Sequence, residues 1–230
     1  MLKRPDAVAS EPLTRIQRNL LARSERRLLT YFCARMPAWM NPDILTAIGV
    51  GGAVTIFAGY ALSAFNAAFL WLAIAGYAIQ WFGDSMDGSL ARFRKIERPS
   101  FGYFLDHSCD GLTSLLILAG IGLSPFVRLD VALLALAGYL LLSVHAYLSA
   151  RVRGELKLSY LNAGPTELRV ALIATTLAMM TLGAGPGRFA PASGFDLIVG
   201  GVGAGLIAMF IVQTLATARR LNALEPSRSR

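Results

Sequence analysis

Long apolar stretches separated by short polar segments make up most of the chain from residue 43 onward. Each stretch is close to the ~20 residues that a helix needs to cross a bilayer. Because backbone polar groups in lipid must be satisfied within their own segment, each stretch is expected to be a helix. The pattern predicts an all-α, polytopic membrane protein with six transmembrane helices. The segments are residues 43–64, 68–91, 102–123, 131–150, 167–184 and 195–217.

Residues 12–36 show a different pattern, in which apolar positions alternate with arginines. This mixture is typical of a basic amphipathic helix that lies on a membrane surface, and the alternative is a solvated helical tail. The apolar positions are Leu13, Ile16, Leu20, Leu28 and Phe32, and the basic ones are Arg15, Arg18, Arg23, Arg26 and Arg27. We therefore predict one domain over residues 1–230, with a tail and surface helix (1–42), a six-helix bundle (43–217) and a second tail (218–230).

Composition agrees with this pattern, and the charges orient it. The chain is 55% hydrophobic and 16% charged, and its mean hydropathy is +0.53. Of its 22 Lys and Arg residues, all but Arg128 and Arg188 lie in segments on one side of the predicted membrane. The positive-inside rule then places both termini and the aspartates of residues 84–110 on the cytoplasmic side. The expected location is the cell inner membrane. The net charge of +8 reflects this topology, and no soluble basic face indicates a nucleic-acid partner.

Glycines are concentrated in the first and last predicted spans. In the last span, Gly201 and Gly205 form a small-xxx-small pair, which lets two helices approach closely. The pair predicts helix packing, either within the chain or with a second copy.

Four aspartates lie at the facing ends of the second and third spans. Asp84 and Asp87 are three residues apart and Asp106 and Asp110 are four apart, so each pair lies on one helix face. The short connection makes the two helices antiparallel neighbours whose carboxylates converge. Four carboxylates in one place repel each other and need a cation. An oxygen-only ligand set favours Mg²⁺, Mn²⁺ or Ca²⁺.

The residues next to the aspartates fit a phosphorylated substrate. Gly88 leaves room for a close approach to the backbone, Ala91 is small, and Arg92 can bind a phosphate. The alternative is a purely structural cluster, in which the aspartates form salt bridges with the basic residues Arg92, Arg94, Lys95 and Arg98.

The remaining residue types that bind metals do not indicate a second site. Cys33 and Cys109 are far apart in the sequence and lack a metal-ligand spacing. His107 and His145 are each isolated, so packing or a lone polar contact is expected for both.

The aspartate segment resembles the signature of the CDP-alcohol phosphotransferase family, D-x2-D-G-x2-A-R-x8/9-G-x3-D-x3-D. Residues 42–46 also resemble the P-N-x-L-T segment at the first span of that family, with Asp43 in place of Asn. Pro99 stands where family members often carry Ser or Thr, and Ser100 follows it. The signature residues in this chain are Asp84, Asp87, Gly88, Ala91, Arg92, Gly102, Asp106 and Asp110.

The resemblance implies a six-helix membrane enzyme, commonly a homodimer, that moves a substituted phosphate from a CDP-linked donor to an alcohol and releases CMP. It implies two Mg²⁺ or Mn²⁺ ions, held by Asp84, Asp87 and Asp106, with Asp110 at the second ion. Asp110 is also implied to take the proton from the acceptor hydroxyl. The candidate donor-binding residues are Gly88, Ala91, Arg92, Gly102, Ser100, Pro42 and Thr46.

The acceptor stays open between two branches of this family. Arg151, Arg153 and Arg169 suit an anionic acceptor such as glycerol phosphate or inositol phosphate with CDP-diacylglycerol as donor, although they also serve as positive-inside charges. Residues 106–110 also resemble the D-H-x-C-D form of choline and ethanolamine phosphotransferases, which use a CDP-amino-alcohol and diacylglycerol.

Two other classes of protein are weighed against this one. Intramembrane prenyltransferases also hold Mg²⁺ on helix aspartates, but they lack the Asp-Gly-x-x-Ala-Arg arrangement and have more spans. A cation transporter needs acidic residues along a path through the membrane, whereas these lie at one boundary. Metal-dependent release of CMP separates the first class from both others.

Overall fold

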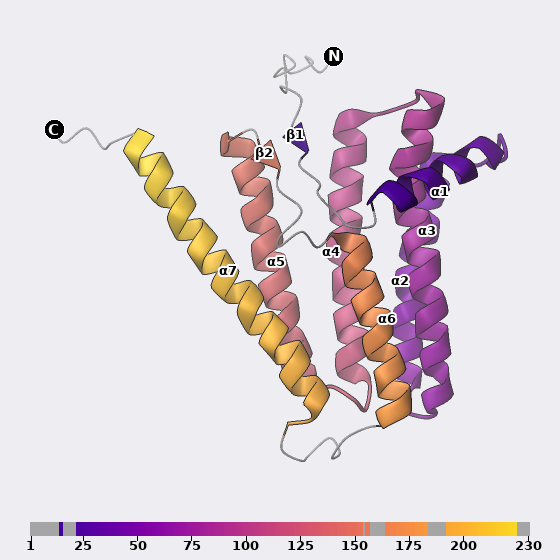
Figure 1. Cartoon of the computed structure of the whole chain (residues 1–230), viewed down its shortest axis with the longest axis vertical. Coiled ribbons are helices and arrows are strands. Elements are labelled where there is room, and N and C mark those ends of the chain that lie inside the picture. Colours follow the sequence, from indigo (N-terminus) through magenta and orange to yellow (C-terminus); the bar gives the residue numbers. More distant parts are fainter. Residues whose placement is uncertain (1–13, 16–21, 154, 157–163, 184–191, 225–230) are drawn as a thin grey trace, which may run out of the picture.

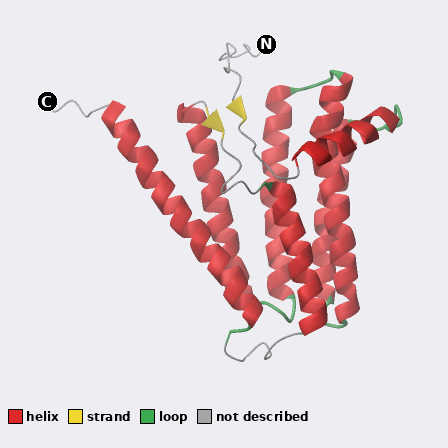
Figure 2. Cartoon of the chain, in the orientation of Figure 1, coloured by secondary structure: helices red, strands yellow, loops and turns green. Residues whose placement is uncertain are grey.

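A computed structural model describes residues 14–15, 22–153, 155–156, 164–183 and 192–224. These residues are almost entirely helical (Figures 1 and 2), so the predicted all-α class is confirmed. The helices are α1 (Ala22–Arg35), α2 (Pro42–Leu62), the short 3-10 helix η1 (Ala67–Phe69), α3 (Leu70–Arg94), α4 (Pro99–Leu123), α5 (Leu129–Arg153), α6 (Pro165–Leu182) and α7 (Gly194–Leu224).

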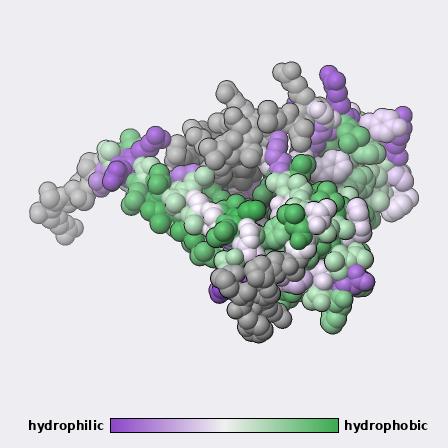
Figure 3. Space-filling view, turned by 60° about the horizontal axis from the view of Figure 1, so that its bottom comes forward, coloured by the Kyte–Doolittle hydropathy of each residue, from purple (hydrophilic) through white to green (hydrophobic). Residues whose placement is uncertain are grey.

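The six long helices α2 to α7 coincide with the six predicted segments. Among the described residues, four of them are long and apolar enough to cross a membrane, namely α2, α4, α5 over Leu129–Val152, and α7. The other two are more polar, because α3 carries Asp84, Asp87 and two arginines near its end and α6 begins with Glu167 and Arg169. Both helices nonetheless expose large apolar side chains, among them Trp71, Ile79 and Val170. Figure 3 shows apolar surface over much of the described part of the molecule in this view.

The amphipathic helix predicted over residues 12–36 is shorter in the structure. Residues 14–15 form a strand, β1 (Thr14–Arg15), which pairs in parallel with β2 (Glu155–Leu156), so the helical prediction is wrong there. Residues 12–13 and 16–21 lie outside the described residues, and helix α1 starts at Ala22. Part of its apolar side packs against the protein, because buried Cys33 and partly buried Phe32 contact α2 and α3.

Local sequence explains where the helices around the site begin and end. Asn41 caps α2, where its side chain accepts a hydrogen bond from the Ile44 backbone at 2.9 Å, and Pro42 fits the first turn. Lys95 ends α3 in a left-handed conformation (φ 55°), and Pro99 starts α4. The two aspartate pairs therefore lie on either side of a short, sharply turned connection.

Glycines bring α2 and α3 into backbone contact. A Cβ atom at Gly52 would stand 2.4 Å from the Gln80 nitrogen, and one at Gly83 would stand 2.3 Å from the Gly49 nitrogen. Only glycine allows these approaches, because real Cβ atoms essentially never come within 3.0 Å. This packing fixes α3 on α2 immediately before Asp84.

In the last helix, the glycines that pack are not the predicted pair. A Cβ atom added at Gly201 or Gly205 would meet nothing within 4 Å among the described atoms, so these two glycines do not mediate close packing within the described part of the chain. The approach of α7 to α5 instead runs through Gly203, where a Cβ would stand 2.8 Å from the Ala135 Cα atom, and through Gly138. Packing of the predicted pair within the chain is therefore not seen among the described residues, while packing against a second copy stays a prediction. All the glycines of α7 look alike in sequence, and only the contact with α5 distinguishes their faces.

Helix α2 lies at the centre of the arrangement. Both α3 and α4 pack against it, so the expected convergence of the second and third segments is achieved through α2. On the other side, α5 joins α4 to α7, while α6 packs on α3. The start of α2, the connection from α3 to α4 and the end of α7 lie at the same end of the bundle, where α1 crosses it (Figure 1).

Candidate metal and substrate site

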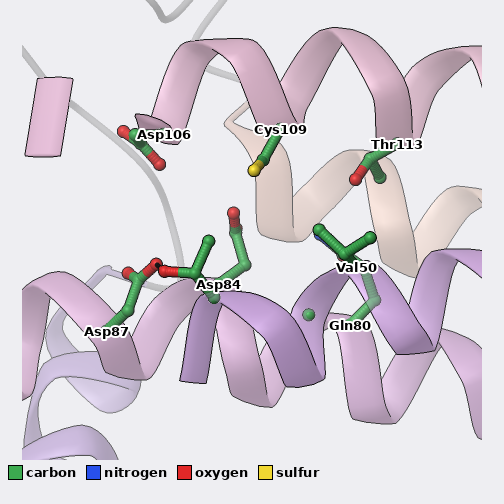
Figure 4. A pocket seen from close by; sticks show the side chains of 9 residues that line it. Val50, Gln80, Asp84, Asp87, Asp106, Cys109 and Thr113 are labelled. Atoms are coloured by element: carbon green, nitrogen blue, oxygen red, sulfur yellow. Dashed lines mark hydrogen bonds between the residues drawn. The ribbon is translucent and has the colours of Figure 1, made fainter. Parts of the chain in front are cut away.

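A pocket lies where α2, α3 and α4 meet near this end of the bundle. Three of the four predicted aspartates line it, with Asp84 and Asp87 on α3 facing Asp106 on α4 (Figure 4). The full lining consists of Thr46, Gly49, Val50, Gln80, Asp84, Asp87, Asp106, Cys109 and Thr113. The structure therefore brings together side chains that are up to 67 positions apart in the sequence, from Thr46 to Thr113.

Asp87 is held by two neighbours. The Thr46 hydroxyl donates to Asp87 Oδ2 at 2.7 Å, and the Gly88 backbone N–H donates to Asp87 Oδ1 at 2.5 Å. Thr46 was predicted as a donor-binding residue, and the structure places it beside a predicted metal ligand. A hydroxyl in this position fixes the direction in which the carboxylate points into the pocket.

Asp106 and Asp110 form a second group with His107. One ligand atom from each of the three lies within 4.8 Å of the others. His107 Nδ1 is 3.5 Å from Asp110 Oδ2 and 4.0 Å from Asp106 Oδ2. The imidazole packs between Tyr103 and Tyr147, with ring centroids 4.4 and 4.8 Å away, which agrees with the packing role expected for it.

These donor atoms fit a hard divalent cation. Asp106 belongs to both groups, so it connects the carboxylates of Asp84 and Asp87 in the pocket to that of Asp110, one turn further along α4. His107 Nδ1 is buried and has no hydrogen-bond partner among the described residues. It is a further candidate metal-ligand atom beside Asp110. Carboxylate oxygens are the preferred ligands of Mg²⁺ and Mn²⁺.

Arg169, one of the predicted acceptor-binding residues, reaches this pocket from α6. Its Nη2 donates to Asp84 Oδ2 at 2.5 Å and its Nε donates to Gln80 Oε1 at 2.6 Å. Only 12% of its side chain is exposed. Arg151 is exposed at the end of α5, and the side chain of Arg153 lies outside the described residues. Of the two whose side chains the structure describes, Arg169 is therefore the one that lies at the aspartates.

The structural alternative expected the basic residues near the α3–α4 connection to pair with the four aspartates. Arg94 and Arg98 have other partners. Arg94 donates to the backbone carbonyls of Met36, Pro37 and Met40, which anchors the segment between α1 and α2. Arg98 pairs with Asp43 and lies over the Phe101 ring. This pairing also gives a role to Asp43, the residue that departs from the family pattern.

Of the predicted donor-binding residues, Thr46 lines the pocket and the others lie on the helices around it, α2, α3 and α4. Gly88 and Ala91 are partly buried on α3, and the exposed Arg92 side chain lies beside Gly88, 3.2 Å from where a Cβ would stand. Ser100 and Gly102 are exposed at the start of α4, and Gly102 has open space around its Cβ position. Pro42 is partly buried, and its carbonyl is 3.2 Å from the Thr46 hydroxyl.

Sequence reasoning missed two polar residues of this region. Gln80 lies one turn before Asp84 and shares Arg169 with it, and its spacing of four and seven residues from the two aspartates was a readable signal. Glu25 is the only acidic residue of α1, and it accepts hydrogen bonds from α3 and α6. An acid inside a strongly basic segment was the available signal for it.

Comparison with known proteins gives the chain a family. The profile of the CDP-alcohol phosphatidyltransferases matches residues 39–218. A curated relative from Pyrococcus horikoshii, archaetidylinositol phosphate synthase, is 36% identical over 118 residues, which are 51% of this chain and 56% of the relative. The match thus spans about half the length of the relative.

A solved structure is also similar to the chain. It is the crystal structure of Mycobacterium tuberculosis phosphatidylinositol phosphate synthase with CDP-DAG bound, at a TM-score of 0.49 and 18% identity, covering 90% of this chain and 98% of that one. The profile match extends from just before α2 almost to the end of α7 and includes every aspartate of the pocket. On that match, the chain is an integral membrane protein of the CDP-alcohol phosphatidyltransferase family.

Proposed function

We propose that the protein transfers a diacylglycerol phosphate group from CDP-diacylglycerol to an alcohol and releases CMP. The observation that carries this proposal is the convergence of Asp84, Asp87 and Asp106 in one pocket, with Asp110 one turn further along α4. Family membership supports the reaction type. We take residues 1–230 to form one such domain.

We assign the metal ligands to the four aspartates, with two Mg²⁺ or Mn²⁺ ions as the expected complement. Bound there, the ions would neutralise the diphosphate of the donor and the charge on the departing CMP. Thr46 contributes by holding Asp87 in one orientation. Gly88 and Arg92 lie next to that carboxylate, where the cytidine and phosphate parts of the donor can contact the backbone and a guanidinium.

Asp110 is the proposed general base. The acceptor hydroxyl oxygen attacks the phosphorus that carries diacylglycerol, and its proton passes to the Asp110 carboxylate. A new P–O bond forms to the acceptor, and the P–O bond to CMP breaks. The His107 ring, packed 3.5 Å from Asp110 Oδ2, limits the positions that this carboxylate can adopt.

Arg169 favours a phosphorylated alcohol as the acceptor. It is a mostly buried guanidinium beside the aspartates, and a phosphate is its natural bidentate partner. The relative named archaetidylinositol phosphate synthase supports an inositol phosphate as the first acceptor to test. The alternative, a CDP-choline or CDP-ethanolamine:diacylglycerol phosphotransferase, rests on residues 106–110, but its uncharged acceptor has no use for Arg169.

We further propose that α2 to α7 all cross the membrane, with α1 at the cytoplasmic surface. Helices α3 and α6 are too polar to be identified as spans by composition, but they lie alongside the four apolar helices in one bundle (Figure 1). The charge distribution supports cytoplasmic termini, a cytoplasmic site and residence in the inner membrane. A homodimer is the expected assembly from the family resemblance.

An acceptor panel tests the proposed function. Purified protein with Mg²⁺ is given CDP-diacylglycerol or CDP-choline, each with inositol phosphate, glycerol phosphate, inositol, serine or diacylglycerol, and the lipid products are identified by mass. We expect CMP and a product from CDP-diacylglycerol with a phosphorylated alcohol only. A product from CDP-choline and diacylglycerol would establish the alternative instead.

A further inference from the structure

Glu25 on the surface helix α1 links three helices through a single carboxylate oxygen. Glu25 Oε1 accepts hydrogen bonds from Trp81 Nε1 on α3 at 2.8 Å and from Thr166 Oγ1 on α6 at 2.8 Å. Ser85 Oγ, one turn along α3, lies 3.4 Å away. Glu25 is partly buried, and a charged acceptor with well-aligned donors makes hydrogen bonds about twice as strong as neutral ones.

The helix that Glu25 holds is the one that carries Arg169. Thr166 lies in the first turn of α6, and Arg169 is three residues further, on an adjoining part of the same turn. A carboxylate near a helix N-terminus is also favoured by the helix dipole. Two polar links thus join the start of α6 to α3: Arg169 with Gln80 and Asp84, and Thr166 with Trp81 through Glu25.

These two links lie side by side on α3. Gln80 and Asp84 contact Arg169. The residues that directly follow them in the sequence, Trp81 and Ser85, contact Glu25. A shift of α6 along α3 would break both links together. The position of Arg169 at the pocket therefore depends on a residue of α1.

We infer that Glu25 is a positioning residue, which ties α1 to the start of α6 and thereby sets where the Arg169 guanidinium stands relative to Asp84. The inference rests on the proposed function, in which Arg169 receives the phosphate of the acceptor. It gives α1 a role in acceptor binding that its basic, amphipathic sequence does not indicate. Loss of the Glu25 link loosens Arg169 without removing any group that touches the donor.

Steady-state kinetics test the link. With CDP-diacylglycerol saturating and inositol phosphate as the acceptor probe, Glu25→Ala is expected to raise the acceptor KM about tenfold, while kcat changes less than threefold. Glu25→Gln keeps an acceptor oxygen and should stay within about threefold of wild type. Thr166→Val should reproduce the KM effect, and Glu25→Ala combined with Thr166→Val should be no worse than either change alone.

Matched controls come from the same helices. Thr175→Val on α6 removes a hydroxyl that, among the described residues, bonds to the Ala171 carbonyl of its own helix, and Trp71→Phe on α3 changes an exposed indole. Both should behave as wild type. If Glu25→Ala does not fold, Thr166→Val and Trp81→Phe carry the test, since each removes one donor to Glu25 and leaves the acid in place.

A readout without activity separates this inference from the proposed function. Cys33 lies on α1 with 3% of its surface exposed, and burial raises the pKa of its thiol, so maleimide should label it slowly in the wild type. Peptide mass spectrometry should show faster Cys33 labelling in Glu25→Ala, and not in the controls. An inactive wild type would reject the proposed function. The labelling experiment would still show whether Glu25 holds α1 in place. Unchanged labelling, or an unchanged acceptor KM in an active Glu25→Ala and Thr166→Val, would overturn the inference.

Discussion

Asp110 differs from the other three aspartates in its surroundings. Asp84 is paired with Arg169, Asp87 is fixed by Thr46, and Asp106 faces both across the pocket, whereas Asp110 lies one turn away beside a buried imidazole. This difference in partners supports the proposal that Asp110 takes the proton while the other three aspartates bind metal only.

Substitution of Asp110 should therefore affect turnover more than binding. Asp110→Asn keeps the shape and one oxygen but removes the base, so turnover is expected to fall by about 10²–10⁴-fold. Metal-dependent binding of the CDP donor should survive better than in Asp84→Asn or Asp106→Asn. Both quantities are measured in all four Asp→Asn variants, and turnover of Asp110→Asn within about threefold of wild type would mean that another group takes the proton.

The sequence predicted the residues of the site better than their partners. The spacing of the four aspartates was enough to place each pair on one helix face, because helical periodicity is a local property. The pairing of Arg169 with Asp84 joins residues 85 positions apart, and the contacts of Glu25 reach 141 positions. Such contacts depend on how α1 and α6 dock on α3, which no local pattern encodes.

At the scale of helices, the glycine contact between α2 and α3 is the feature that holds the site. The backbones touch at Gly52 and Gly83, and the next residue along α3 after Gly83 is Asp84. Any side chain at this contact must push the two helices apart. The site therefore depends on packing as much as on its carboxylates.

Gly83→Ala should weaken both the fold and the activity. Its Cβ would lie 2.3 Å from the Gly49 nitrogen and 2.5 Å from the Leu45 carbonyl oxygen, both backbone atoms that cannot move alone. Overpacking of this kind typically costs about 1–3 kcal/mol of stability. Gly51→Ala is the control, because nothing lies within 4 Å of its Cβ position. Thermal unfolding in detergent compares them, and a Gly83→Ala variant as stable as Gly51→Ala would argue against this packing.

Element boundaries were predictable to the extent that local signals mark them. Helix α2 starts at Pro42, one residue before the predicted segment, and α4 starts at Pro99, three residues before it, where a cap or a proline marks the first turn. The strand at Thr14–Arg15 was not predictable, since its partner lies near residue 155 and the segment itself reads as amphipathic. Which glycines of α7 pack closely was likewise not predictable, because it depends on the contact with α5.

At the scale of the whole molecule, the charges and the bundle point to one orientation in the membrane. The connection from α3 to α4, with Lys95 and Arg98, and the end of α7, with Arg219 and Arg220, lie at one end of the bundle (Figure 1). Arg128 lies in the connection from α4 to α5 at the other end. The candidate site is at the basic end. In the orientation that we propose, phosphorylated substrates reach this site from the cytoplasm.

Reporter fusions test this orientation. A reporter that is active only in the cytoplasm should work when fused after Leu224, and one that is active only outside should work when inserted beside Arg128. The same pair of reporters exchanged between the two positions gives the control. Cytoplasmic location of Arg128 would contradict the six-span arrangement.

The central claim is that the aspartate pocket carries out a metal-dependent transfer from a CDP-linked donor. The most direct measurement is CMP release by the purified protein from CDP-diacylglycerol with inositol phosphate, before and after exhaustive chelation and then after Mg²⁺ or Mn²⁺ is restored. We predict activity that is lost on chelation, returns with either ion, and is absent in Asp84→Asn and Asp106→Asn. Full CMP release after chelation, or in either variant, would contradict the account.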